Sequence, residues 1–322
     1  MAQSHGQSSG ESIPVSAYIA IFAAIASISA AAILIRFALS ETMPPLLIAC
    51  ARLFVASVVL TPIALRRYIH HIQSLTRFEL LLAGVSGLFL AIHFMAWVSS
   101  LQFTTVLVSV VIVTTGPIWV AILEVAFLRL RLSSLIIIGL LIALAGGILI
   151  GLPLGDSSTA ISNAVRQDTN LTGAFLAWVG ALAVSVYMLI GRKLRRTLPV
   201  IPYIWLVYSI ATIVLLCVLL VTQTQITGYS SVGYMILLAM GLVPQLIGHS
   251  SINYVLEYFP ATLVSMFTQL EPIGSAILAY IFLAEIPPSQ QIIGSGIILC
   301  GVLIASRGEA TESTEKTKNN SS

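Results

Sequence analysis

The sequence predicts an all-α membrane protein with ten transmembrane helices, arranged as two inverted five-helix repeats. Hydrophobic residues make up 58% of the 322 residues and charged residues only 8%, whereas a soluble domain carries about a quarter charged residues. The apolar residues gather in runs of membrane-spanning length without barrel-type alternation, which favours helices. The third observation is an internal repeat, because residues 114–150 and 269–305 align at an offset of 155 positions with 14 of 37 residues identical.

The ten predicted spans are each about 20 mostly apolar residues long, which is enough to cross a hydrocarbon core of roughly 30 Å. Short connections join most of them, so consecutive helices are expected to be antiparallel neighbours. No Lys or Arg precedes the first span, which argues for a permanent helix rather than a cleaved signal peptide. The spans are 15–36, 45–65, 78–100, 104–127, 133–153, 171–191, 200–222, 231–256, 260–284 and 289–306.

One long polar connector divides these spans into five and five. We therefore predict a polar N-terminal tail (1–14), a first repeat (15–153), a polar linker (154–170), a second repeat (171–306) and a C-terminal tail (307–322). The C-terminal tail is polar and poor in apolar residues, so we expect it to be disordered.

Lys and Arg residues are distributed unevenly between the two ends of the spans. If the N-terminus is cytoplasmic, twelve of them face the cytoplasm and only Arg36 and Arg166 face outward. The positive-inside rule then predicts a multi-pass protein of the plasma (inner) membrane with both termini cytoplasmic. Because each half has an odd number of spans, the second half enters from the opposite side, and the repeat is inverted. Inverted repeats give a protein two nearly equivalent conformations, one facing each compartment.

Polar side chains inside the spans are few, and they gather on two helices. Gln245, His249 and Asn253 follow one another at four-residue intervals on the eighth span, which places them on one helical face. His93 and Trp97 have the same spacing on the third span, and the repeat maps His93 to within one position of His249. Polar groups inside a membrane usually face a cavity or a partner helix. We therefore expect the two histidines to lie across a common centre.

Two interpretations of these histidines remain open. In the first they line a solute path, where an imidazole can hydrogen-bond a solute or titrate near neutral pH; proton coupling is the narrower form of this hypothesis. In the second each histidine only bridges two helices, and replacing His249 with Ala leaves activity unchanged.

Glu271 lies about eleven residues into the ninth span, directly before Pro272. Proline lacks an amide hydrogen and leaves a preceding carbonyl without its helical partner. A carboxylate beside freed backbone is a candidate binding or gating group, and a buried structural carboxylate is the alternative. Pro117 marks the matching bend of the fourth span, where Gly116 replaces the acid. We predict hinges at Pro117 and Pro272, and we place Gln269 among the site residues.

Arg52 lies some seven residues into the second span, too deep for an ordinary loop charge. It can pair with a buried acid such as Glu271, extend to the outer surface, or contact an anionic group of a solute. Two further acids are expected at helix ends. Glu124 precedes Arg129 and Arg131 and is predicted to form an interfacial ion pair, and Glu285 ends the ninth span.

No enzyme, cofactor or metal pattern is present in the sequence. The chain has no phosphate-binding Gly-Lys-Ser/Thr loop, so ATP is not expected to drive it directly. Neither central histidine has a second ligand at metal spacing, and the three cysteines lie far apart in apolar runs. The basic run 192–196 adjoins a span and is interpreted as an orientation signal rather than a nucleic-acid patch. We predict no enzymatic activity, no cofactor and no metal.

Several segments resemble the EamA-type branch of the drug/metabolite transporter superfamily. The resemblance is carried by TGPIWVAILEVAFLRLRLSSLIIIGLLIALAGGILIG in the first half and LEPIGSAILAYIFLAEIPPSQQIIGSGIILCGVLIA in the second, and it covers about residues 15–306. The Leu-Glu-Pro element at 270–272, Glu285 and Arg52 match the family's pattern. The first repeat departs from it, with Leu130 in place of the second acid and Gly116 in place of the first.

The resemblance implies ten helices, cytoplasmic termini and movement of small metabolites, often export. We therefore predict a secondary transporter, an exporter or facilitator, that moves a small polar or amphipathic metabolite by alternating access. The expected partners are this solute, protons as an option, membrane lipids and, as an option, further copies of the chain, with no nucleic acid. The alternatives are a nucleotide-sugar or lipid-type carrier and, in another class, a membrane enzyme acting on a lipid-linked substrate. The substrate-binding residues are expected to be Arg52, His93, Trp97, Gln245, His249, Asn253, Gln269 and Glu271.

Overall fold

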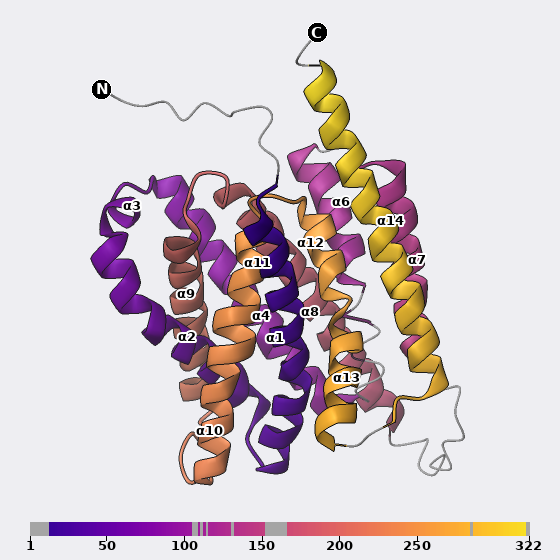
Figure 1. Cartoon of the computed structure of the whole chain (residues 1–322). Helices are drawn as coiled ribbons and strands as arrows, with labels where there is room; N and C mark the ends of the chain where they lie inside the picture. The colour runs from indigo at the N-terminus through magenta and orange to yellow at the C-terminus, as the bar shows by residue number, and fades with distance from the viewer. Residues whose placement is uncertain are drawn as a thin grey trace.

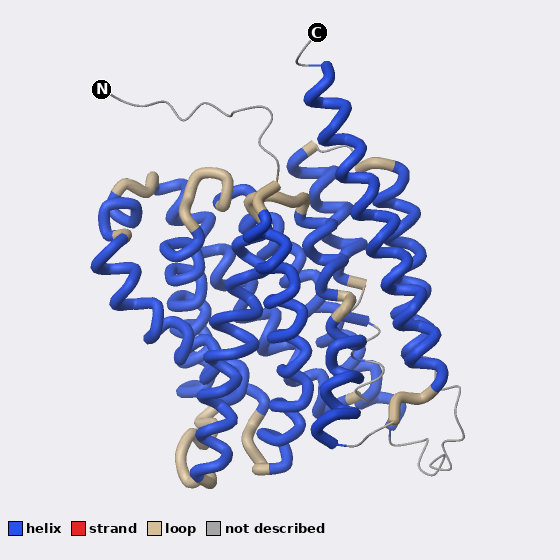
Figure 2. The backbone as a smooth tube through the Cα atoms, viewed as in Figure 1, coloured by secondary structure: helices blue, strands red, loops and turns tan. Residues whose placement is uncertain are grey.

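The computed structural model describes residues 13–104, 109, 112–113, 115–129, 132–151, 166–283 and 286–319. Within these ranges the chain folds into helices joined by short turns, and no strand occurs in them (Figure 2). Most helices lie side by side in one bundle (Figure 1). The bundle end at which α1 begins and α14 finishes is called the upper end, as drawn in Figure 1.

The first half of the chain contains helices whose starts follow local sequence signals. Pro44 precedes α2 and Pro45 opens it, where a missing amide hydrogen is tolerated. The Thr76 side chain and Glu79 form a capping box at the start of α4. The helices are α1 (Val15–Ser40), α2 (Pro45–Arg67), α3 (Ile69–Gln73), α4 (Arg77–Phe103), α6 (Gly116–Leu128) and α7 (Ser134–Gly151).

The second half repeats this order with more interruptions. Its helices are α8 (Arg166–Leu194), α9 (Val200–Val221), α10 (Ser231–Met240), η1 (Gly241–His249), α11 (Ser250–Val255), α12 (Ala261–Thr268), α13 (Glu271–Leu283) and α14 (Ser289–Asn319). The element η1 is a π-helix between α10 and α11. Pro244 lies inside it and cannot donate a backbone hydrogen bond, which favours a locally wider helix.

Seven of the ten predicted spans are helices long and apolar enough to cross a membrane. They are Val15–Ser40, Pro45–Arg67, Arg77–Phe103, Leu171–Leu194, Val200–Val221, Ser231–Val255 and Ser289–Gly308. Gly116–Leu128 and Ser134–Ile150 are apolar but shorter. The all-helical architecture with membrane-spanning helices is therefore confirmed for the described residues, while the count of ten spans is not.

The predicted ninth span is not one continuous helix. It consists of α12 and α13, separated at Gln269 and Leu270, because Pro272 removes an amide donor and restricts the residue before it. In the described part of the fourth span, α6 begins at Gly116 with Pro117 in its first turn. The two prolines thus lie in the first turn of a helix, rather than at the middle of a bent one.

The C-terminal segment also differs from the prediction. The backbone of α14 stays helical to Asn319, twelve residues beyond Arg307, where the sequence predicts a disordered tail. A helix that already exists extends without a new nucleation cost, so a polar continuation can remain helical.

The two repeats meet at a pair of equivalent helices, α7 and α14, that run in opposite directions. An offset of 155 maps Gly139 to Gly294 and Gly146 to Gly301. A Cβ added at Gly301 would lie 2.6 Å from the carbonyl oxygen of Gly139, and one added at Gly146 would lie 2.7 Å from that of Gly294. Each contact is therefore the image of the other under the repeat, as an approximate two-fold axis between the helices requires.

A second pair of equivalent helices, α2 and α9, is related by the same offset, and its two members are also in contact. The hydroxyl oxygens of Ser57 and Thr212 lie 3.4 Å apart, and these residues are separated by 155 positions. A residue in contact with its own repeat image lies at the approximate axis. The indole nitrogen of Trp205 donates to Thr61 at 3.0 Å, which shows that α2 and α9 run antiparallel.

We predict that Gly301→Leu destabilises the protein by roughly 1–3 kcal/mol, because overpacking separates two closely packed helices. The free energy of unfolding in a detergent titration measures the effect. Gly296→Leu is the matched control on the same helix, since an added Cβ there meets nothing within 4 Å. Equal losses in the two variants would contradict the close approach of α7 and α14.

Candidate functional site

The centre of the bundle holds a buried arginine. Arg52, on α2, is 1% exposed, and its Nε donates to Oε1 of Gln245 on η1 at 2.9 Å. Its guanidinium carbon lies 4.1 Å from the ring centroid of Phe94 on α4. A charge in this position is costly unless polar or aromatic groups surround it. Arg52 therefore contacts an amide and a ring instead of extending to the surface.

Both central histidines contact this ring. The ring centroid of Phe94 is 4.9 Å from that of His93 and 5.3 Å from that of His249. His93 Nδ1 lies 2.9 Å from the carbonyl oxygen of Gly180, so Nδ1 carries the hydrogen. The imidazole of His93 stacks on Trp97 at 6.0 Å with an interplanar angle of 9°. The structure thus brings together the histidines that the repeat relates.

A second group of polar side chains extends from α11 toward α8 and α9. Asn253 is 0% exposed, and its Oδ1 accepts a hydrogen bond of 2.7 Å from the Tyr187 hydroxyl. Its Nδ2 donates to the carbonyl oxygen of His249 at 2.6 Å. The Tyr208 hydroxyl lies 3.4 Å from both Asn253 Nδ2 and Ser250 Oγ. Sequence reasoning missed Phe94 and Tyr187, because an aromatic residue in an apolar span carries no distinguishing pattern.

Glu271 and Gln269 lie where α12 ends and α13 begins. The Glu271 carboxylate is within electrostatic range of Arg52, yet no ion pair joins these two described residues. Gln269 is buried at the interruption itself. Glu271, His249 and Trp97 are partly exposed, whereas Arg52 and Gln245 are buried.

The starts of α6 and α13 each lie beside a serine of the other half. Ser29 Oγ on α1 lies 3.3 Å from the carbonyl oxygen of Glu271, and Ser185 Oγ on α8 lies 3.2 Å from that of Gly116. Each hydroxyl has its shorter contact, 2.7 Å, with a carbonyl oxygen of its own helix, of Ile25 and of Ala181 respectively. The offset of 155 maps Gly116 to Glu271, and it maps Ser29 to within one position of Ser185. The start of α6 and the start of α13 are therefore equivalent positions, each in contact with a serine of the other repeat.

Glu124 has a different role from the interfacial ion pair predicted for it. It is 0% exposed, and its carboxylate accepts hydrogen bonds from the backbone amides of Ala261 and Thr262 at 2.7 and 2.9 Å. The Thr262 hydroxyl donates a third bond of 2.6 Å. Glu124 therefore caps the first turn of α12 from α6, where the unsatisfied amides of a helix start favour an anion. The other acid predicted at a helix end, Glu285, lies outside the described residues.

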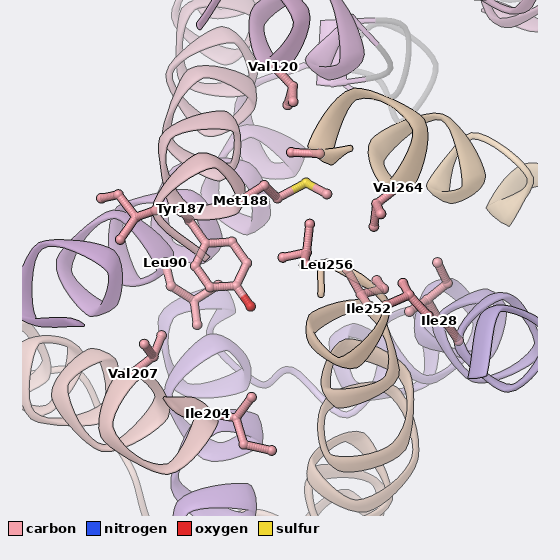
Figure 3. Packing of buried hydrophobic residues seen from close by; sticks show 14 of the residues in the cluster. Ile28, Leu90, Val120, Tyr187, Met188, Ile204, Val207, Ile252, Leu256 and Val264 are labelled. Carbon is pink, nitrogen blue, oxygen red and sulfur yellow. The ribbon is translucent and has the colours of Figure 1, made fainter. Parts of the chain in front are cut away.

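An apolar cluster fills the bundle between the polar centre and the upper end. Side chains from seven helices and from the turn after α11 converge there (Figure 3). The labelled members are Ile28, Leu90, Val120, Tyr187, Met188, Ile204, Val207, Ile252, Leu256 and Val264. Apolar side chains therefore lie between the polar centre and the upper end, and a smaller buried cluster that includes Met43, Ile48 and Met240 lies toward the lower end.

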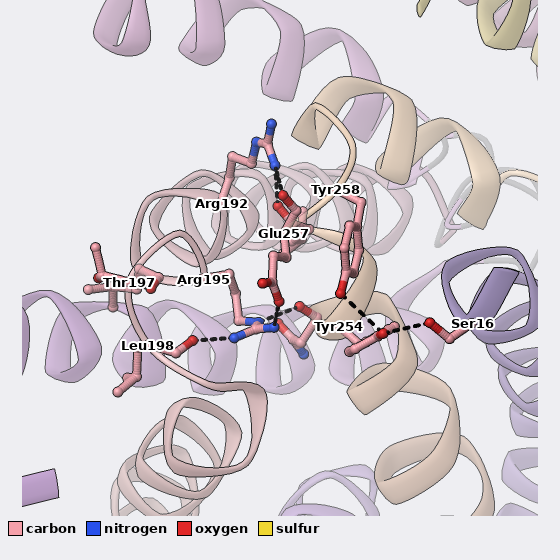
Figure 4. A network of polar contacts seen from close by, with 11 residues as sticks. Ser16, Arg192, Arg195, Thr197, Leu198, Tyr254, Glu257 and Tyr258 are labelled. Atoms are coloured by element: carbon pink, nitrogen blue, oxygen red, sulfur yellow. Dashed lines mark hydrogen bonds and ion pairs between the residues drawn. The ribbon is translucent and has the colours of Figure 1, made fainter. Parts of the chain in front are cut away.

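A polar network covers the same end (Figure 4). Arg195 is 2% exposed, pairs with Glu257, and donates to the carbonyl oxygens of Leu198 and Asn253. Arg192 donates to the carbonyl oxygens of Leu256 and Glu257 at 2.6 and 2.8 Å. Burial lowers the pKa of the Arg195 guanidinium and nearby Glu257 acts in the opposite direction. The network ties the turn after α8 to the turn between α11 and α12.

A bundle of apolar helices built from two repeats, with a polar centre between them, defines an integral membrane protein of the transporter class. The EamA-like transporter family matches residues 15–152 and 171–307. The two matches cover both repeats and most of the chain. The chain belongs to the EamA-like transporter family, which confirms the resemblance noted in the sequence.

Two curated relatives are named only as transporters. An uncharacterized transporter of Archaeoglobus fulgidus is 26% identical over 201 residues, 62% of this chain and 67% of its own. The uncharacterized transporter YdfC of Bacillus subtilis is 23% identical over 195 residues, 61% of this chain and 60% of its own. One crystal structure superposes with a TM-score of 0.73 over 91% of this chain and 97% of its own length. Its sequence identity of 19% makes it a match of fold alone.

Proposed function

We propose that this protein is a secondary transporter that moves a small polar or amphipathic solute by alternating access. The observation that carries this proposal is that contacts between equivalent helices of the two repeats occur in symmetry-related pairs, with a polar centre between the repeats. Each close approach of α7 and α14 has its repeat image, and the Ser57–Thr212 contact is its own image. We infer that the two repeats are inverted as wholes, which supplies two conformations of similar free energy.

Charge distribution supports an orientation for this transporter. Eight described Lys and Arg residues lie in or beside turns of the upper end, whereas Arg36 and Arg166 lie near the lower ends of α1 and α8; the eight are Arg66, Arg67, Arg77, Arg129, Arg192, Lys193, Arg195 and Arg196. The positive-inside rule assigns the upper end to the cytoplasm. A second apolar cluster, which includes Met43, Ile48 and Met240, packs toward the lower end. The upper end carries the polar network in addition to its apolar cluster, so we infer that it is the more firmly closed end in this conformation.

Solute movement in sealed vesicles tests the proposal directly. Purified full-length protein is expected to accelerate exchange of a radiolabelled solute from a panel of small metabolites, relative to protein-free vesicles. Arg66→Gln, at the end of α2 and away from the centre, is the matched control variant and should exchange at the wild-type rate. Folded protein that moves no solute of the panel in either direction would refute the transporter assignment. Chemical conversion of a lipid-linked solute would favour the enzyme alternative.

A further inference from the structure

Two buried nitrogen atoms at the centre have no hydrogen-bond partner within the described residues. They are Nη2 of Arg52 and Nε2 of Gln245, whose side chains are bonded to each other. The two residues are 1% and 0% exposed. The Tyr208 hydroxyl lies near the Gln245 side chain but does not have hydrogen-bond geometry with its Nε2. Folded proteins leave few buried polar groups unpaired, because each one loses its hydration without compensation. This pair therefore requires a physical explanation.

The chemistry of arginine determines which atoms of the Arg52–Gln245 pair have no hydrogen-bond partner. Arginine has donors and no acceptor, so Gln245 must turn its oxygen toward Arg52 and its NH₂ group away. Both unpartnered atoms are therefore donors on adjacent side chains. Trp97, on the same helix as Phe94, adds a third buried donor without a partner among the described residues, its indole Nε1. What these side chains lack is an acceptor.

The surroundings restrict the acceptor further. Arg52 lies on the ring of Phe94, and the ring stack of His93 and Trp97 lies on the same helix. Glu271 is the acid within electrostatic range of Arg52, and it forms no ion pair with it. A ligand with one negative charge would compensate Arg52 and meet less repulsion from Glu271 than a doubly charged phosphate would. The aromatic rings favour an apolar body next to the charged group.

We propose that Arg52 and Gln245 form a subsite for the carboxylate of an amphipathic monocarboxylate, with Phe94 and Trp97 beside its apolar part. A carboxylate offers two acceptor oxygens, one for Nη2 of Arg52 and one for Nε2 of Gln245, in charge-assisted hydrogen bonds. This inference rests on the proposed function and names the chemical class of its solute.

The test uses the full-length protein in detergent with three probes of the same shape. These are 3-phenylpropionate, its neutral amide 3-phenylpropionamide, and the amine 3-phenylpropylamine, each titrated against the thermal unfolding midpoint. The carboxylate is expected to stabilise the protein and to bind at least about tenfold more tightly than the amide, since only it forms charge-assisted bonds. The amine is expected to give no shift.

Variants then assign the effect to the subsite. Arg52→Lys keeps the charge but loses the planar fork, so carboxylate binding should weaken at least about fivefold, and Gln245→Met should weaken it as well. Arg66→Met, on the same helix, is the matched control and should bind as the wild type does. Equal binding of carboxylate and amide, or a carboxylate effect that Arg52→Lys and Gln245→Met leave intact, would overturn the subsite. If the subsite is overturned in this way but the protein still exchanges solute in vesicles, the transporter assignment stands. If folded wild-type protein exchanges no solute, both the subsite and the transporter assignment are refuted.

Discussion

Glu124→Leu is expected to cause one of the largest losses of stability of any single substitution, roughly 3–5 kcal/mol, because it leaves buried donors without an acceptor. The carboxylate is 0% exposed and receives three hydrogen bonds from Ala261 and Thr262. Pro260 precedes this helix and provides no side-chain cap of its own. Removing Glu124 therefore leaves the first amides of α12 without their hydrogen-bond acceptor and weakens the packing of α12 against α6.

Glu124→Gln refines the same prediction. The amide keeps one acceptor oxygen but turns an NH₂ group toward donors, so we expect an intermediate loss of about 2 kcal/mol. Glu79→Gln is the matched control, because Glu79 also receives hydrogen bonds at a helix start, from Thr76 at the surface. Its loss should stay within about 1 kcal/mol. Unfolding titrations of the three variants measure the order, and similar losses at Glu124 and Glu79 would contradict the capping role.

Arg195→Met is expected to open the upper end of the bundle far more than Glu257→Gln does. Glu257 is 41% exposed, so water screens the ion pair and its loss should cost about 1 kcal/mol or less. Arg195 is 2% exposed and also bonds the carbonyl oxygens of Asn253 and Leu198. Charge-assisted bonds of this kind contribute roughly 1.5–3 kcal/mol each, so removal of the arginine should cost several times more.

Hydrogen exchange of the backbone amides in residues 253–264 measures this opening. Each 1.4 kcal/mol corresponds to about a tenfold rise in exchange, so Arg195→Met should raise it by roughly two orders of magnitude and Glu257→Gln by less than one. Exchange in α7 and α14 should stay unchanged in both variants, which separates local opening from global unfolding. A larger effect of Glu257→Gln would show that the ion pair, not the backbone contacts, holds this end together.

Hydropathy and the internal repeat predicted most of the fold because lipid imposes one simple rule on chain composition. Seven spans follow from apolar length alone. The interruption at Gln269 and the π-helix at Pro244 could not be predicted from the sequence. A proline shows only that regular helical hydrogen bonding is lost near it. Neighbouring helices decide whether the chain bends, breaks or widens there.

The polar centre was predicted in part, because the spans contain few polar residues and those few therefore stand out. Arg52, His93, Gln245, His249 and Asn253 lie around it, although their role in binding stays a prediction. Glu124 was misassigned because its sequence neighbours Arg129 and Arg131 suggested a local pair, whereas its partners are 137 and 138 positions away. Long-range hydrogen bonds of this kind leave no local pattern.

Chemical labelling of the polar centre from each side of the membrane is the most direct test of alternating access. In a chain with Cys50, Cys217 and Cys300 replaced by Ala, a single His249→Cys substitution places a thiol beside Phe94, and a membrane-impermeant maleimide is added to either face of sealed vesicles. Alternating access predicts labelling from both faces, with Arg195→Met raising the rate at the upper end and lowering it at the opposite end. Labelling from one face only, unchanged by Arg195→Met, would contradict alternating access.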